Sequence, residues 1–241
     1  MYKKTFAFFI LLFSVVVFNG YATEKNRTAN DADVSGQSFR EIYVARPRIH
    51  GPEIKRLQER LVELGFAGVG EADGFYGPRT AEEIYFIKAA LGFVDHYIPE
   101  DDWRPDDYSV VNDELWGIIF DPENTVFLNS ISRIRFFNND PLIHEPANNP
   151  NVTEFKETRL PFVEPDWVPP WGSGSGGKVQ REYCYGVGTN RISITETIET
   201  VFVTSTTVRD FTFPNGLQIR QSVHSADSPI TEVRFSIPQG E

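Results

Sequence analysis

Hydrophobic residues recur at helical spacing between residues 47 and 120. Three stretches share this pattern, with apolar positions three or four residues apart: Ile54, Leu57, Leu61 and Leu64; then Ile84, Ile87 and Leu91; then Leu115, Trp116 and Ile119. Pro52 and Pro78 suit the first turns of the first two helices, and Gly65 and Gly92 suit their ends. The pattern therefore predicts three short helices, the third from Val111 to Phe120.

The spacing changes to a period of two in residues 179–241. Val233 and Phe235 alternate with Arg234, and Pro214-Asn215-Gly216 is a typical hairpin turn between two such runs. We expect roughly four to six antiparallel strands with one solvated face.

Residues 121–178 interrupt the two patterns. They are rich in Pro and Asn and end in a Gly/Ser stretch, so we interpret them as an irregular linker with a possible strand at Val126–Phe137. Residues 23–46 are polar and predict a flexible segment. The chain as a whole is predicted to be α+β, with a small N-terminal three-helix bundle followed by a separate antiparallel β region.

The N-terminus has the layout of a secretory signal peptide. Lys3 and Lys4 precede an apolar run from Phe6 to Phe18, and Ala22 offers a small residue for cleavage. We expect residues 1–22 to be removed and the protein to be exported to the periplasm or cell envelope. The alternative is a retained N-terminal anchor. The run is shorter than the roughly 20 residues of a stable membrane span, and no later stretch is apolar enough to form one.

The net charge and the cysteine content argue against two features, nucleic-acid binding and an internal disulfide. The net charge is −11, and an acidic chain repels the phosphates of nucleic acid. Cys184 is the single cysteine, so no internal disulfide can form.

The loop between the first two predicted helices carries the clearest motif. Leu57-Gln58, Leu61, Leu64-Gly65-Phe66, Asp73-Gly74-Phe75, Gly77-Pro78 and Thr80 follow the order of the peptidoglycan-binding domain found in bacterial wall hydrolases, which this region, residues 47–120, resembles. The resemblance implies a small helical module that binds a peptidoglycan glycan strand or stem peptide. A sugar presents apolar faces and a polar rim, so the ligand-binding candidates are Asp73, Phe75, Tyr76 and Arg79.

Other chemical motifs are incomplete. The four histidines lack the spacing of a zinc site, and Cys184 lacks the Ser-His-Gly-Cys run of wall transpeptidases. The glycines of Trp171–Val179 have the spacing of a phosphate-binding loop, which needs a strand before it and a helix after it. Here a Pro-rich stretch precedes and a strand pattern follows, so we interpret the segment as a linker. The acidic run Asp101–Asp107 lacks the spacing of a calcium loop, which favours a solvated loop. We predict no catalytic residue, metal site or cofactor.

The sequence thus favours an exported, non-catalytic peptidoglycan-binding protein whose β region has an unknown contact. The first alternative is a wall hydrolase or transpeptidase with a divergent catalytic domain, using Asp101 and Glu114, or Cys184 with His224. The second alternative keeps the helical fold but gives it an envelope protein as its partner.

Overall fold

The structure is a computed structural model that describes residues 41–95, 97–98, 108–162, 176–225 and 231–238. The predicted signal peptide (1–22) and the acidic run Asp101–Asp107 lie outside these residues. All described residues belong to one compact unit, Phe39–Glu241. Across the described ranges, no helix combines the length and apolarity needed to cross a bilayer.

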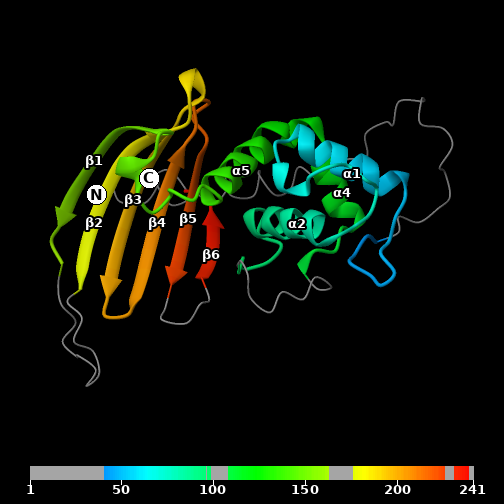
Figure 1. Cartoon of the computed structure of the whole chain (residues 1–241), viewed down its shortest axis with the longest axis horizontal. Helices are drawn as coiled ribbons and strands as arrows, with labels where there is room; N and C mark the ends of the chain where they lie inside the picture. Colours follow the sequence, from blue (N-terminus) through cyan, green and yellow to red (C-terminus); the bar gives the residue numbers. More distant parts are fainter. Residues whose placement is uncertain (1–40, 96, 99–107, 163–175, 226–230, 239–241) are drawn as a thin grey trace, which may run out of the picture. The chain divides into compact units, whose positions relative to one another are not determined.

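Helices occupy the first part of this unit. They are α1 (Pro52–Glu63), α2 (Pro78–Ala90), α4 (Asp113–Phe120) and α5 (Thr125–Asn138), with short 3₁₀ turns η1 (Ala67–Val69), η2 (Pro122–Asn124), η3 (Pro146–Asn148) and η4 (Gly188–Asn190) (Figure 1). The three predicted helices are confirmed as α1, α2 and α4. The three-helix bundle predicted from them is not confirmed, because a fourth helix, α5, packs against α2. Asn129 and Ser132 of α5 also donate hydrogen bonds to the carbonyl of Leu64 after α1.

The strand predicted at Val126–Phe137 is therefore wrong. Its β-branched and aromatic residues suggested a strand, but its buried apolar positions are Leu128, Ile131, Ile134 and Phe137. These residues recur every three positions, which places them along one face of a helix. Burial of that face outweighs the modest β-propensity of single residues.

The end of α1 shows why glycine stands at position 65. Gly65 has φ 96°, and the N–H of Phe66 donates to the carbonyl of Leu61 over 2.9 Å, which closes the last turn. A Cβ at this position would also lie 2.7 Å from the hydroxyl of Ser132 in α5. The glycine thus serves both the helix end and the packing of α5.

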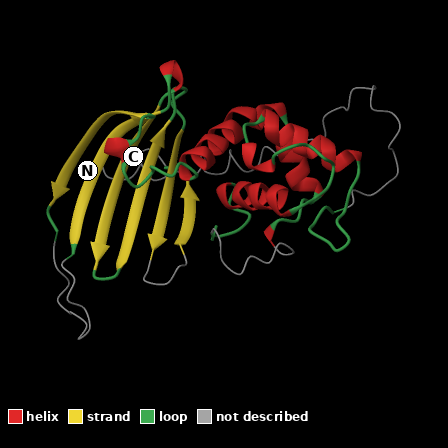
Figure 2. Ribbon diagram, viewed as in Figure 1, coloured by secondary structure: helices red, strands yellow, loops and turns green. Residues whose placement is uncertain are grey.

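The rest of the chain forms one sheet. Its strands are β1 (Val152–Leu160), β2 (Gly177–Tyr185), β3 (Ile192–Val201), β4 (Thr204–Thr212), β5 (Gln218–Ser225) and β6 (Thr231–Ser236). Each strand pairs antiparallel with the next in chain order (Figures 1 and 2). The period of two after residue 179 is confirmed. The linker predicted for residues 121–178 is corrected, because this region contains α5 and the edge strand β1.

The two faces of the sheet differ in polarity. Tyr183, Ile194, Phe211 and Ile219 lie side by side across four strands and are buried. Phe137 of α5 packs on this face, with its ring centroid 5.4 Å from that of Phe211. The opposite face carries Thr, Ser, Gln and charged residues, as expected for an antiparallel sheet with one solvated side.

The β region is not separate from the helices. The ring of Phe86 in α2 lies 5.2 Å from that of Phe235 in β6. Tyr97, after α2, exchanges two backbone hydrogen bonds of 2.8 Å with Val233 of β6. These contacts join helices and sheet into one hydrophobic core, which corrects the prediction of two independent regions.

Candidate functional site

The loop between α1 and α2 is organised by Gln58. Its side chain is 2% exposed, and its Nε2 donates to the carboxylate of Asp73 (3.0 Å), the carbonyl of Phe75 (3.1 Å) and the hydroxyl of Thr80 (3.2 Å). Its Oε1 accepts from the N–H of Gly74 at 2.7 Å. One amide therefore joins Asp73, the turn at Gly74 and the first turn of α2.

Asp73 shapes this turn. Its carboxylate accepts from the N–H of Phe75 at 2.9 Å as well as from Gln58. These two hydrogen bonds hold the pKa of Asp73 below its ordinary value, so the side chain is ionised at neutral pH. Gly74 follows with φ 76°, which a residue with a side chain rarely adopts.

The preceding segment holds the other side of the loop. Gly51 donates its N–H to the carbonyl of Gly74 (3.1 Å), and Tyr76 donates its N–H to the carbonyl of Ile49 (2.9 Å). His50 pairs with Phe75 in this short ladder, and their rings lie 5.2 Å apart. The loop is thus bonded on two sides, which limits its freedom to move.

Three of the four predicted ligand residues reach the surface. Phe75 is 45% exposed, and Asp73 and Arg79 are exposed beside it in sequence. Within the described residues, neither Arg79 nor the neighbouring Arg48 forms an ion pair with a carboxylate. We call the exposed residues of this loop and of the segment paired with it the Phe75 surface (Arg48, His50, Asp73, Phe75 and Arg79).

Tyr76, the fourth candidate, lies in the core. Its side chain has no exposed area, and its hydroxyl donates to the carbonyl of Ser109. Burial raises the pKa of the phenol well above its ordinary value. A side chain without exposed area presents nothing to a ligand at the surface, so Tyr76 has a structural role.

Thr80 and Glu83 are three residues apart, the spacing of a capping box, but they do not cap α2. Helix α2 starts at Pro78, with Gly77 before it, so both residues lie inside the helix. Thr80 accepts from Gln58, and Glu83 turns toward α5. Both side chains instead hydrogen-bond to residues that are distant in the chain, Gln58 and Arg135.

We expect Gln58→Ala to lower the free energy of unfolding by about 2 kcal/mol, since it leaves the buried groups of Gly74 and Thr80 without partners. Urea denaturation of the full chain measures this loss. Gln218→Ala, at an exposed position of β5, is the matched control and should change stability by less than about 0.5 kcal/mol. Equal losses in the two variants would contradict the role assigned to Gln58.

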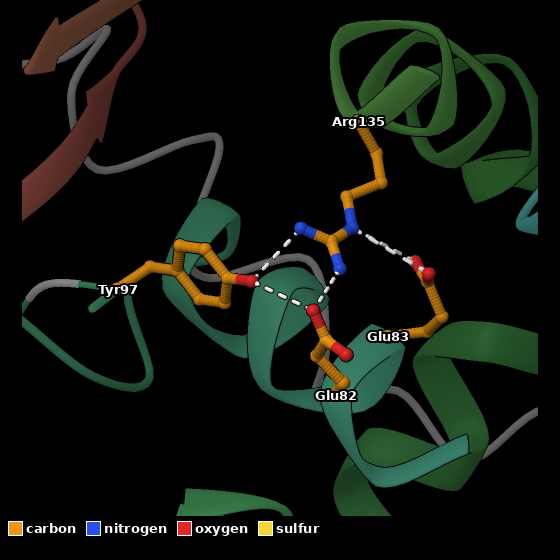
Figure 3. A network of polar contacts seen from close by, with 4 residues as sticks. All are labelled: Glu82, Glu83, Tyr97 and Arg135. Atoms are coloured by element: carbon orange, nitrogen blue, oxygen red, sulfur yellow. Dashed lines mark hydrogen bonds and ion pairs between the residues drawn. The ribbon is translucent and has the colours of Figure 1, made fainter. Parts of the chain in front are cut away.

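Glu83 belongs to a second polar network, which joins α2, α5 and the segment after α2 (Figure 3). Arg135 of α5 lies at its centre, donating to Tyr97 Oη over 2.8 Å and to Glu82. Both carboxylate oxygens of Glu83 lie 3.4 Å from Arg135 Nε. Tyr97 Oη also donates to Glu82 over 3.3 Å.

Two charged residues of this network are buried. Glu83 is 2% exposed and Arg135 is 8% exposed. Burial raises the pKa of Glu83, while the neighbouring guanidinium opposes that rise. Arg135 and Glu83 are 52 positions apart in the chain, so no local sequence pattern predicts that they are partners. An arginine within the apolar pattern of α5 was the available signal.

The proposed catalytic pairs are not assembled in the described residues. Cys184 aligns across the sheet with Gln218 of β5, three strands away, and His224 lies six residues further along β5. Strand spacing and rise place the two side chains about 14 Å apart across the sheet and about 20 Å apart along it. Glu114 is exposed in the first turn of α4, and its partner Asp101 lies outside the described residues.

Metal ligands do not converge either. Among the described residues, no group of three or more His, Cys, Asp or Glu side chains is placed to hold a metal ion. His224 Nδ1 lies 3.0 Å from the hydroxyl of Thr206, and His50 contacts Phe75.

Comparison with models of known protein families, with curated proteins and with solved structures finds no match to this chain.

Proposed function

We propose that this protein is an exported, non-catalytic binder of peptidoglycan, and that the Phe75 surface contacts the glycan strand or stem peptide. The observation that carries the proposal is the exposed ring of Phe75 on a loop fixed by Gln58. The resemblance of residues 57–80 to the peptidoglycan-binding domain supports it, because the residues of that motif build this loop.

The chemistry of the surface suits a saccharide with attached peptide. The apolar face of a pyranose packs on an aromatic ring, and the hydroxyls at its rim hydrogen-bond to charged side chains. Asp73 accepts such bonds, while Arg79 and Arg48 donate them and also attract the carboxylates of a stem peptide. These two arginines give a chain of net charge −11 a local cationic surface.

A fixed loop favours binding. Gln58 and the backbone bonds to Ile49 and Gly51 hold the ring of Phe75 before a ligand arrives. Ligand binding then costs little ordering entropy in the protein. The sheet, with its polar face, remains available for a second contact in the envelope.

We expect Phe75→Ala to weaken binding to purified sacculi by about tenfold, since the variant loses the ring on which a sugar would pack. Co-sedimentation of the full chain over a range of sacculus concentrations measures the change. Phe93→Ala, which removes another partly exposed ring (39% exposed), is the matched control and should bind as the unchanged protein does. Equal pelleting of both variants would exclude the Phe75 surface as the contact.

The same incubation tests the enzymatic alternative. Chromatography of the supernatant should show no muropeptides beyond those of a control without protein. Released products would establish a hydrolase. Failure of the unchanged protein to co-sediment with sacculi would overturn the proposal, and capture of an envelope protein in its place would favour a protein partner.

A further inference from the structure

A groove of about 330 Å³ opens beside α5, away from the Phe75 surface. Its volume lies at the lower end of the range for ligand pockets, roughly 300–1,000 Å³. Its lining residues follow α1, belong to α5, or come from the end of β2 and the connection to β3; they include Gly65, Arg133, Phe136, Tyr185, Val187 and Asn190.

Arg133 is the charged residue of this groove. It is half-buried, its guanidinium lies 5.4 Å from the ring centre of Phe213, and Nη2 donates to the backbone carbonyl of Asn190. Burial lowers its pKa. In the part of the chain that the structure describes, no carboxylate lies within ion-pair distance of this guanidinium.

The other packed arginines make a useful contrast. Arg135, Arg181 and Arg209 each contact at least one glutamate. A guanidinium that is partly removed from water without a counter-charge is costly, and an anion that enters the groove would offset that cost. Because the guanidinium has five N–H donors, it can bind a carboxylate while keeping its bond to Asn190.

Three other polar side chains that line the groove already have hydrogen-bond partners. Asn129 Nδ2 and Ser132 Oγ both donate to the carbonyl of Leu64, at 3.1 and 2.7 Å. The hydroxyl of Tyr185 donates to Asp140 at 2.7 Å. Asp140 also accepts from the side chains of two asparagines, so this carboxylate already has three donors. Arg133 is thus the group that can receive a ligand's charge.

Two exposed apolar side chains line the groove. Phe136 on α5 is 61% exposed, and Val187 after β2 is 82% exposed. Such side chains gain by covering the apolar part of a ligand. Inorganic phosphate has no such part, and a long acyl chain exceeds the volume of the groove. The combination fits a small molecule that carries a carboxylate next to a short apolar group.

We propose that this groove binds the free carboxyl terminus of a short peptide, with the carboxylate on Arg133 and a small apolar side chain between Phe136 and Val187. The inference is independent of the proposed function, because the groove contains no residue of the Phe75 surface. A peptide can bind here whether or not the protein binds sacculi through Phe75.

Calorimetric titration of the full chain with N-acetyl-trialanine and with its C-terminal carboxamide tests the proposal. We expect the free acid to bind at least about tenfold more tightly than the amide, since only the acid makes charge-assisted bonds to Arg133. Arg133→Gln should abolish this preference. Arg159→Gln is the matched control and should keep the preference for the acid. Arg159 is exposed near the end of β1 and does not line the groove.

Val187→Asp provides a second variant at a position exposed enough to leave the fold intact. The added carboxylate should weaken binding of the acid several-fold and leave the amide unaffected. Equal binding of acid and amide by the unchanged protein would overturn the proposal. Full displacement of the peptide by equimolar inorganic phosphate would also overturn it, because the groove would then be a general anion site.

Discussion

Replacing Arg135 by alanine should lower the free energy of unfolding by about 3–5 kcal/mol at neutral pH, because the variant leaves the carboxylate of Glu83 buried without a counter-charge. Urea denaturation of the full chain measures this loss. Arg135→Met, which keeps the aliphatic stem, should lose nearly as much. Arg220→Ala removes an exposed arginine paired with Asp210 and should cost less than about 1 kcal/mol.

The loss should also depend on pH. Burial raises the pKa of Glu83 above its ordinary 4.5, so the folded protein holds this proton more tightly than the unfolded chain. Protonation of Glu83 therefore stabilises the folded protein. This stabilisation is complete below the unfolded pKa of 4.5 and is lost as the pH rises through the higher pKa of folded Glu83. Without Arg135 the pKa of Glu83 rises further, and below pH 4.5 Glu83 is neutral in both states. The cost of Arg135→Ala should therefore be smaller at about pH 4 than at pH 7, and an equal cost would contradict an ionised Glu83 as the cause.

Glu196→Ala should cost a similar 3–5 kcal/mol, because Glu196 is the shared partner of two arginines on the packed face of the sheet. Glu196 is 1% exposed and accepts from Arg209 at 2.7 Å and from Arg181 at 3.5 Å. These three residues lie in one cross-strand row over β2, β3 and β4. Removal of the glutamate leaves Arg209, itself 6% exposed, without its carboxylate partner.

Glu199→Ala is the matched control for this variant. Glu199 is on the same strand but on the solvated face, where it pairs with Lys178 at 2.9 Å, and its removal should cost less than about 1 kcal/mol. The double variant Glu196→Leu/Arg209→Met removes both charges and should recover much of the lost stability. Thermal denaturation of the three variants in parallel compares their losses of stability. A double variant as unstable as Glu196→Ala would show that the loss comes from packing and not from an unpaired charge.

Local signals predicted α1, α2 and α4 correctly. Proline at the start, glycine at the end and apolar residues three or four positions apart all act within one or two turns of helix. The same signals were weaker in α5, where Val126, Phe127 and Ile131 also suit a strand. The choice there depends on what the segment packs against. Phe137 packs on Phe211 and Tyr185, which are 74 and 48 positions further along the chain.

The motif predicted which loop forms the candidate site, but not which of its aromatic side chains is exposed. The run Asp73-Gly74-Phe75-Tyr76 placed two adjacent aromatic residues in the loop, and both were predicted to meet ligand. Phe75 forms a β-bridge with His50. In this pairing the side chain of Phe75 is exposed and that of Tyr76 is buried in the core. Neighbouring residues of an extended segment point to opposite sides, so one of the pair had to be buried. Only the paired segment, 25 positions before Phe75, decides which one.

The sequence by itself determined the α+β class, the turn at Asp73-Gly74 and the alternation that separates the faces of the sheet. These features follow from backbone sterics and from short-range hydrophobic periodicity, which a single segment carries. Only the tertiary structure decided that helices and sheet share a core, that Arg135 pairs with Glu82 and Glu83, and that Arg133 meets no carboxylate in the described part of the chain. Desolvation and ion pairing depend on distances between groups far apart in sequence, so they are properties of the folded chain and not of any segment within it.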